Sequence, residues 1–246
     1  GAIVRRLFSY ATSQLAVVET SAGGAWSARW ITQAGTTLCA TPRNMTAAFA
    51  TGKTHAAQLR DRILLTHSTS EPWLFDSEGD ATPRLAGLPP PQLSPSSLSA
   101  TNAQAVATAT IVSYRAIIRR AHADGYETIS APSGPIYITN SIGSTHNPVL
   151  FVDLPGNSGG TVAIAGDIVE LYRSKAQPVG SSPGDTLYLA MAYTLSASDI
   201  TARRAPLTDT AIESSLTAEL YSNPNQDGLG LAKLPPPLSD DVDVFK

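Results

Sequence analysis

Apolar and polar positions alternate in the first part of this chain. Trp26 and Trp30 are part of an alternation with polar residues, and a period of two is typical of a half-buried strand. Residues 15–20, Leu-Ala-Val-Val-Glu-Thr, are typical of a strand, and residues 21–24, Ser-Ala-Gly-Gly, favour a turn. The pattern therefore predicts a β-hairpin that joins these residues to a strand at 25–32.

Short apolar runs return in the second half, where glycine, proline, serine and asparagine separate them. Short strands at this spacing are typical of a β-sandwich or barrel, and not of a parallel sheet with helical crossovers. We therefore expect a mainly β protein in which two antiparallel sheets pack face to face. The expected strands are 15–20, 25–32, 136–139, 149–154, 161–172 and 186–195. The expected core includes Trp26, Trp30, Phe151, Ile164 and Leu187.

One long stretch favours a helix over a strand. Residues 99–124 are rich in alanine, a serine or threonine can cap their start, and Gly125 suits a helix end. The β-branched residues within 108–113 favour a strand, so a strand is the alternative for this stretch. A second, short helix is expected within 208–220.

Prolines interrupt the pattern in residues 68–99, which contain six of them. Because proline fixes φ and lacks an amide donor, we expect an irregular insertion there and no regular element. The strand pattern also fades from residue 201 onward, which predicts an extended irregular arm over 201–246. The predicted division is therefore a β-sandwich domain over 1–200, with its insertion at 68–99, followed by the arm.

The charge of the chain narrows the classes of function. Charged residues make up 15% of the chain, and the formal net charge is −3. An average soluble domain has about 25% charged residues, so this surface is polar but weakly charged, which suits a subunit covered by its neighbours. A nucleic-acid-binding module should carry a basic patch or arm, whereas the three Arg-Arg pairs of this chain lie far apart.

Few residues have the types or spacings that cofactor or metal sites need. Cys39 is the single cysteine, which excludes an internal disulfide. His55, His122 and His146 have no metal-ligand spacing, so we expect no metal-binding and no cofactor-binding residue. No apolar run approaches about 18 residues, so no membrane span is expected either.

One motif contains the elements of a nucleophilic site. Residues 155–160, Pro-Gly-Asn-Ser-Gly-Gly, resemble the nucleophile loop of trypsin-like serine proteases in the form used by the HtrA group. Glycines let the backbone turn so that amides near Ser158 can point at a developing oxyanion. The resemblance implies Ser158 as nucleophile, His67 as base and Asp76 or Asp80 as the orienting acid.

The rest of the protease pattern is missing from the chain. His67 follows an apolar run, but Asp76 and Asp80 fall in a segment rich in proline and glycine. Glu170 stands where those proteases normally have glycine. Because glycine, asparagine and serine are also the default loop residues, we interpret the motif as a turn. We expect no catalytic residue and no hydrolytic activity.

A second resemblance concerns the end of the β-rich region. Residues 168–172 and 186–195, with a loop containing Pro178 between them and the tail 205–210 after them, resemble the end of a tymovirus-type coat protein. Residues 1–6, Gly-Ala-Ile-Val-Arg-Arg, are similar to the start of the shell domain in hepatitis-E-like capsids. Together these matches cover under a quarter of the chain.

The coat-protein resemblance implies a jelly-roll β-sandwich with irregular arms that neighbouring subunits hold in place. It also implies a structural capsid subunit that self-assembles into an icosahedral shell and resides in the virion, after assembly in the host cytoplasm. The implied partners are copies of the chain and, in a polyprotein-processed capsid, sister capsid proteins. Contact with the genome is expected to be weak or indirect, because the chain has no basic arm.

Overall fold

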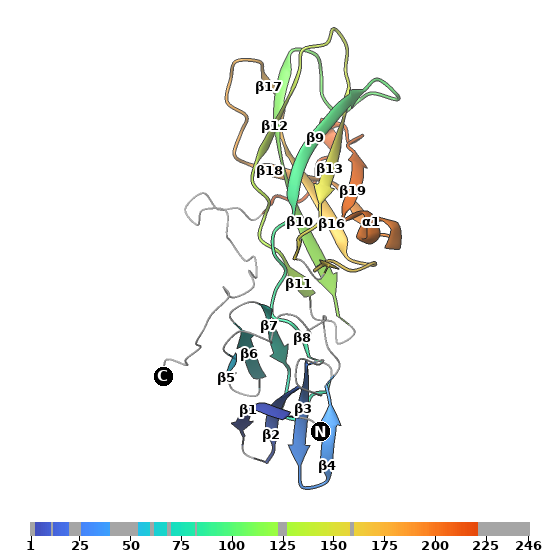
Figure 1. The fold of residues 1–246 in the computed structure, drawn as a ribbon. Coiled ribbons are helices and arrows are strands. Elements are labelled where there is room, and N and C mark those ends of the chain that lie inside the picture. The colour runs from blue at the N-terminus through green and yellow to red at the C-terminus, as the bar shows by residue number, and fades with distance from the viewer. Residues whose placement is uncertain are drawn as a thin grey trace. The chain divides into compact units, whose positions relative to one another are not determined.

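The computed structural model describes residues 3–10, 12–19, 26–39, 54–59, 62–67, 70–81, 83–122, 127–157 and 160–220 (Figure 1). Over these residues the protein is mainly β, with antiparallel sheets and one α-helix, as the sequence predicts. The described chain divides into two compact units, one from Ile3 to Gly87 and the other from Leu88 to Leu220.

The first unit contains two four-stranded antiparallel sheets. One has the order β1-β2-β3-β4 and the other β5-β6-β7-β8, so that each is a simple meander. The strands of the first sheet are β1 (Ile3–Ser9), β2 (Gln14–Glu19), β3 (Trp26–Thr32) and β4 (Gly35–Leu38). Those of the second sheet are β5 (Thr54–Leu59), β6 (Arg62–His67), β7 (Ser70–Phe75) and β8 (Arg84–Leu85).

Aromatic side chains hold the first unit together. Trp30 on β3 and Phe75 on β7 are fully buried, and their ring centroids lie 5.8 Å apart in an edge-to-face arrangement. Such pairs add stability beyond the area that they bury. The Trp30 indole also donates a 2.7 Å hydrogen bond to the backbone carbonyl of Asp80, which satisfies its buried polar atom.

The second unit is built around one long strand, β10 (Thr110–Ala121). It belongs to a six-stranded antiparallel sheet in which β18 pairs with β16 and the remaining strands pair with β10. Its other members are β11 (Glu127–Ile129), β12 (Ile136–Asn140), β16 (Ile168–Ser174), β17 (Gln177–Pro178) and β18 (Leu187–Thr194).

A three-stranded sheet, β9-β13-β19, faces this larger sheet. Figure 1 shows β13 between β9 and β19 in the second unit. Its strands are β9 (Gln92–Ser99), β13 (Asn147–Asp153) and β19 (Arg204–Thr208). The unit also holds the hairpin of β14 (Gly156–Asn157) and β15 (Gly160–Thr161), the helix α1 (Ala197–Ala202) and the short 3-10 helix η1 (Glu213–Ser215).

Alternate side chains of β10 form the inner layer of this sandwich. Val112, Tyr114, Ala116 and Ile118 are all fully buried. Successive residues of a strand point to opposite faces, so these four share one face of the sheet. Tyr114 reaches Asp209, which directly follows β19, and this contact joins the two sheets face to face.

The helix predicted over 99–124 is wrong, because β9 ends at Ser99 and β10 covers 110–121. The alternative, a strand, is the correct one. The β-branched residues at 110–112 and the burial of side chains on both faces of β10 outweigh the helix propensity of the alanines. The described helix, α1, lies at 197–202 instead, and within 208–220 the short helical turn is η1.

Most predicted strands occur, but their distribution over sheets is wrong. Residues 15–20 and 25–32 correspond to β2 and β3, which belong to the first unit and not to the sandwich that contains β13 and β16. The segment 68–99 is not irregular either, since it contains β7, β8 and β9. Pro95 is tolerated in β9 because this is an edge strand, where a missing donor costs no ladder bond.

The predicted core residues have mixed outcomes. Trp30 and Leu187 are buried, as predicted. Phe151 is half-buried. The prediction that Ile164 belongs to the core is wrong, because its side chain is 52% exposed. The side chain of Trp26 lies outside the described residues.

Part of the predicted arm is described. Residues 204–208 form β19, which pairs with β13, and residues 221–246 lie outside the described residues. The division into 1–200 and 201–246 stays a prediction.

Candidate functional site

The hexapeptide at 155–160 lies in a small β-hairpin. Gly156 pairs with Thr161 and Asn157 pairs with Gly160, in antiparallel register. The amide of Val162 donates to the carbonyl of Pro155 over 2.8 Å, which closes the base of the hairpin. Ser158 itself lies outside the described residues. The interpretation of the motif as a turn without catalytic function therefore stays a prediction.

The other residues of the protease hypothesis belong to the first unit. His67 ends β6, and its side chain lies outside the described residues. The Asp76 carboxylate accepts a 2.5 Å hydrogen bond from the Arg84 guanidinium and lies 3.5 Å from that of Arg62. Asp80 accepts a hydrogen bond from the amide of Asp76. Both carboxylates therefore have structural partners within the first unit.

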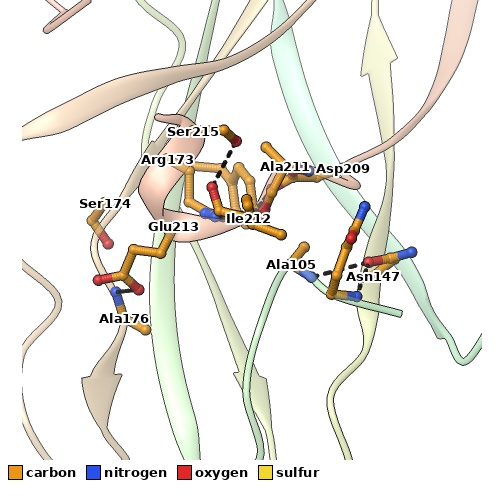
Figure 2. A network of polar contacts seen from close by, with 12 residues as sticks. Ala105, Asn147, Arg173, Ser174, Ala176, Asp209, Ala211, Ile212, Glu213 and Ser215 are labelled. Carbon is orange, nitrogen blue, oxygen red and sulfur yellow. Dashed lines mark hydrogen bonds and ion pairs between the residues drawn. The ribbon is translucent and has the colours of Figure 1, made fainter. Parts of the chain in front are cut away.

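The best-defined polar cluster of the second unit lies between its two sheets (Figure 2). The guanidinium of Arg173 on β16 lies 2.5 Å from the Asp209 carboxylate, and both side chains are almost fully buried. The hydroxyl of Tyr114 donates to the same carboxylate oxygen over 2.7 Å. The other oxygen of Asp209 accepts from the Ala211 amide, and Arg173 donates to the Ala211 carbonyl. We call these four residues the buried latch.

Burial and mutual contacts set the electrostatics of the buried latch. Burial raises the pKa of Tyr114 well above its ordinary value, and the Asp209 charge raises it further, so the phenol stays a hydrogen-bond donor. Burial alone would lower the pKa of Arg173, but the charge of Asp209 and the contacts with Tyr114 and Asp209 together outweigh burial and raise that pKa. The arginine therefore remains charged.

The buried latch is suited to holding the sheets and not to chemistry. Each of its charged groups is used by a partner within the cluster, and Tyr114, Arg173 and Asp209 are at most 1% exposed. A catalytic group must reach its substrate, which a fully bonded and buried group cannot do. Removing one partner of such a pair is strongly destabilising. The latch therefore fixes where the chain leaves the sandwich after β19.

A second buried polar residue organises a loop of the same unit. The side-chain oxygen of Asn147 accepts hydrogen bonds from the amides of Gln104 and Ala105, at 2.9 and 3.1 Å. Its side-chain nitrogen donates to the carbonyls of Thr101 and Asn102, both at 3.0 Å. All of its polar atoms are thereby used to hold the loop 101–105, part of which Figure 2 shows beside Ala105.

The most unusual surface of the described chain is the strand β1. All its side chains except Phe8 are exposed, and the exposed fractions of Val4 and Leu7 are 54% and 48%. Among the described residues, β1 pairs with β2 alone, so its outer edge has no described partner. Unpaired edges with apolar side chains are the places where proteins add a further strand.

The register with β2 assigns each side chain of β1 to a face. Val4 and Leu7 pair with Val18 and Ala16, which share one face of β2. A register shift between Val4 and Arg6 absorbs Arg5 as an extra residue, which preserves this arrangement.

The other face of β1 is formed by Ile3, Arg6 and Phe8, whose partners on β2 alternate with those of the first face. Arg5 forms an ion pair with the buried Glu19, whereas Arg6 is exposed and has no ion pair among the described residues. The edge of β1 thus presents two apolar side chains on one face, and on the other face a cation that has no ion pair among the described residues and lies between Ile3 and Phe8.

In the second unit, by contrast, an edge strand of the larger sheet is covered by a later segment of the chain. Residues 217–220 pair along β18, where the amide of Leu189 donates to the Ala218 carbonyl and that of Leu220 donates to the Leu187 carbonyl, both at 2.8 Å. The Leu220 side chain packs into a cluster with Ile117 and Tyr172. Residues 217–220 therefore cover the start of the β18 edge, whereas the outer edge of β1 has no described partner.

The described residues contain no group of three or more metal-ligating side chains. His146 and His122 each form a local hydrogen bond, to the Ser144 carbonyl and to the Thr128 hydroxyl. Within the described part of the chain, no helix has the length and apolar character needed to cross a membrane.

Comparisons with known proteins give no relative of this chain. No family model matches it, and neither the curated proteins nor the solved structures include a match. The surfaces and contacts of the described residues are therefore the basis for the function proposed below.

The sequence analysis did not identify the buried latch, the loop contacts of Asn147 or the exposed edge of β1. Arg173 and Asp209 are separated by 36 positions, and no local pattern connects them. The two arginines between apolar pairs at 3–8, Ile-Val-Arg-Arg-Leu-Phe, could have indicated an exposed strand, since charged residues on a strand are typical of an edge.

Proposed function

We propose that this chain is a structural capsid subunit that assembles with copies of itself into an icosahedral shell. The observation that carries the proposal is the edge strand β1, whose apolar side chains are exposed on both faces. Exposed apolar side chains are unfavourable in water, and the free energy falls when another chain covers them. In a shell, every subunit supplies such a partner to its neighbour.

The architecture of the second unit supports the same function. It is an antiparallel sandwich of a six-stranded and a three-stranded sheet, which is the general architecture of many coat proteins. Its surface also exposes large apolar side chains far apart in sequence, Tyr137, Ile142, Ile164, Val179 and Ile212. The low charge of the chain adds to this support, because contacts between subunits disfavour charged residues.

The proposed partners are copies of the chain and, in a polyprotein-processed capsid, sister capsid proteins in the virion. The net charge of −3 argues for weak or indirect contact with the genome, since phosphate binding requires clustered lysine and arginine. We propose no catalytic role: glycine, asparagine and serine are ordinary loop residues, and the carboxylate of Asp76 is held by arginines.

Electron microscopy of two variants tests this proposal. In Val4→Asp/Leu7→Asp, two exposed apolar side chains of β1 become charged, and we expect closed particles from the parent chain but not from this variant. Leu38→Asp is the matched control and should still form particles, because its side chain is 55% exposed on β4, the opposite edge strand of the same sheet. Both variants should keep the β-type circular dichroism. Particles from the β1 variant, or none from the parent chain, would contradict the proposal.

A further inference from the structure

We propose that the outer edge of β1 binds the acidic segment 239–246 of a neighbouring copy, which adds to the sheet as a fifth strand. This inference rests on the proposed assembly and names the contact that joins one copy to the next. The segment reads Ser-Asp-Asp-Val-Asp-Val-Phe-Lys and lies outside the described residues.

The pattern of the segment matches the two faces of β1. In a strand, Val242 and Val244 share one face, and Asp241 and Asp243 share the other. One face of β1 carries Val4 and Leu7, so the valines can cover those apolar side chains. Cross-strand pairs of apolar residues are the main unit of sheet stabilisation.

The other face carries the charge complementarity. Arg6 is exposed without an ion pair among the described residues, and it lies between Ile3 and Phe8 on its face of β1. A strand whose aspartates occupy this face places a carboxylate opposite Arg6. A second β1 strand in the same place would instead bring arginines together, which is unfavourable. The edge is therefore better suited to the acidic segment than to another β1.

A late segment of this chain already uses the same mode of binding within one copy. Residues 217–220 add to the edge of β18 by backbone hydrogen bonds and insert Leu220 into an apolar cluster. Strand addition of this kind obtains affinity from the backbone and specificity from alternate side chains. Residues 239–246 would repeat this at the edge of β1.

The length of the chain between the two segments allows contact with a neighbour. Residues 221–238 separate Leu220 from Ser239, and such a stretch spans up to about 60 Å when extended. A compact unit the size of the second one, which contains Leu220, is only about 35 Å across, so a stretch of this length can reach beyond that unit. The three prolines at 235–237 favour extended backbone just before the segment.

Cysteine cross-linking in a mixture of two full-length variants tests the contact. Chains with Leu7→Cys are mixed with chains with Val244→Cys and oxidised at pH 8, and mass spectrometry identifies the linked peptides. Leu38→Cys is the matched control, because Leu38 is 55% exposed on β4, the opposite edge strand of the same sheet. Burial raises the pKa of Cys39 to about 12, so this native thiol does not compete at pH 8.

We expect the Leu7→Cys chain to link to the Val244→Cys chain, and the Leu38→Cys chain not to link. Arg6→Asp should slow the cross-link about fivefold, and Asp241→Arg/Asp243→Arg in the partner chain should restore it. A failure of this charge exchange to restore the rate would contradict the assigned faces. A third sample is the double variant Leu7→Cys/Val244→Cys. If its two cysteines link within one chain, and no link ever forms between chains, the assignment to a neighbouring copy is overturned.

The same samples separate this inference from the proposed function. Particle formation is measured by native mass before oxidation. If particles form without any link from Leu7→Cys to Val244→Cys, the inference is wrong and the assembly stands. If neither particles nor links form, both are wrong.

Discussion

Replacing Arg173 by methionine should destabilise the second unit by about 3–5 kcal/mol, because the Asp209 carboxylate would then be buried without its counter-ion. Asp209 would keep the hydroxyl of Tyr114 and the amide of Ala211 as donors, but neither carries a charge. Methionine retains much of the volume of arginine, so the loss of packing is small.

A double variant separates the charge effect from the loss of side-chain contacts. In Arg173→Met/Asp209→Asn no ionised group remains in the latch, and the asparagine oxygen can still accept from the Ala211 amide. Its nitrogen can donate to the Tyr114 oxygen, in place of the bond in the opposite direction. We expect this double variant to recover at least about 1 kcal/mol of the loss, because an unpaired buried charge costs more than a neutral pair.

Urea unfolding with two spectroscopic probes measures these changes. All three tryptophans, at positions 26, 30 and 73, belong to the first unit, whereas far-UV circular dichroism reports on both units. The midpoint from tryptophan fluorescence should therefore change little, while the dichroism transition of the second unit moves to lower urea. If Arg173→Met costs less than about 1 kcal/mol, or if the double variant is the less stable of the two, the buried-charge account is refuted.

Three further predictions concern other sites. Because burial raises the pKa of Cys39 from 9.0 to about 12, its neutral thiol contributes stability that is complete below pH 9 and lost as the pH rises toward 12. Between pH 8 and 11, the free energy of unfolding of the first unit should thus fall by about 2–3 kcal/mol more in the parent chain than in Cys39→Ala. Urea unfolding followed by tryptophan fluorescence measures this, and equal decreases in the two chains would contradict it. Asn147→Asp replaces a donor to two loop carbonyls by an acceptor, so a protease should cleave loop 101–105 at least about tenfold faster than in the parent chain. Ser144→Ala is the control. Equal cleavage of Asn147→Asp and the parent chain would show that the loop does not depend on Asn147. A fluorophosphonate probe should not label Ser158, and labelling of the parent chain but not of Ser158→Ala would overturn the turn interpretation.

The sequence predicts local features of the fold well. The strands β2, β3, β12, β13 and β18 lie within about two residues of their expected positions, because alternation and turn residues are local signals. Pairing between strands is not local, which explains why the two units were not separated: nothing near residues 15–32 indicates that their partner strands lie in the first unit. The error at β10 arose because alanine-rich composition and β-branched residues conflict there, and tertiary packing decides between them.

The interior contacts of the second unit were less accessible to prediction. Tyr114 and Asp209 are 95 positions apart, and Asp209 lies in a stretch that reads as an irregular tail. A carboxylate in such a stretch is ordinarily solvated, so its burial beside Arg173 follows only from the way β16 and β19 meet. The exposure of β1 depends in the same way on which strands it pairs with.

If the chain builds a shell from copies of itself, as we propose, its native mass in solution will be that of many copies. Mass photometry or sedimentation velocity of the full chain should show a discrete particle of many copies that forms cooperatively as the concentration rises. A single species at the monomer mass of 25.7 kDa throughout the concentration series would contradict the account.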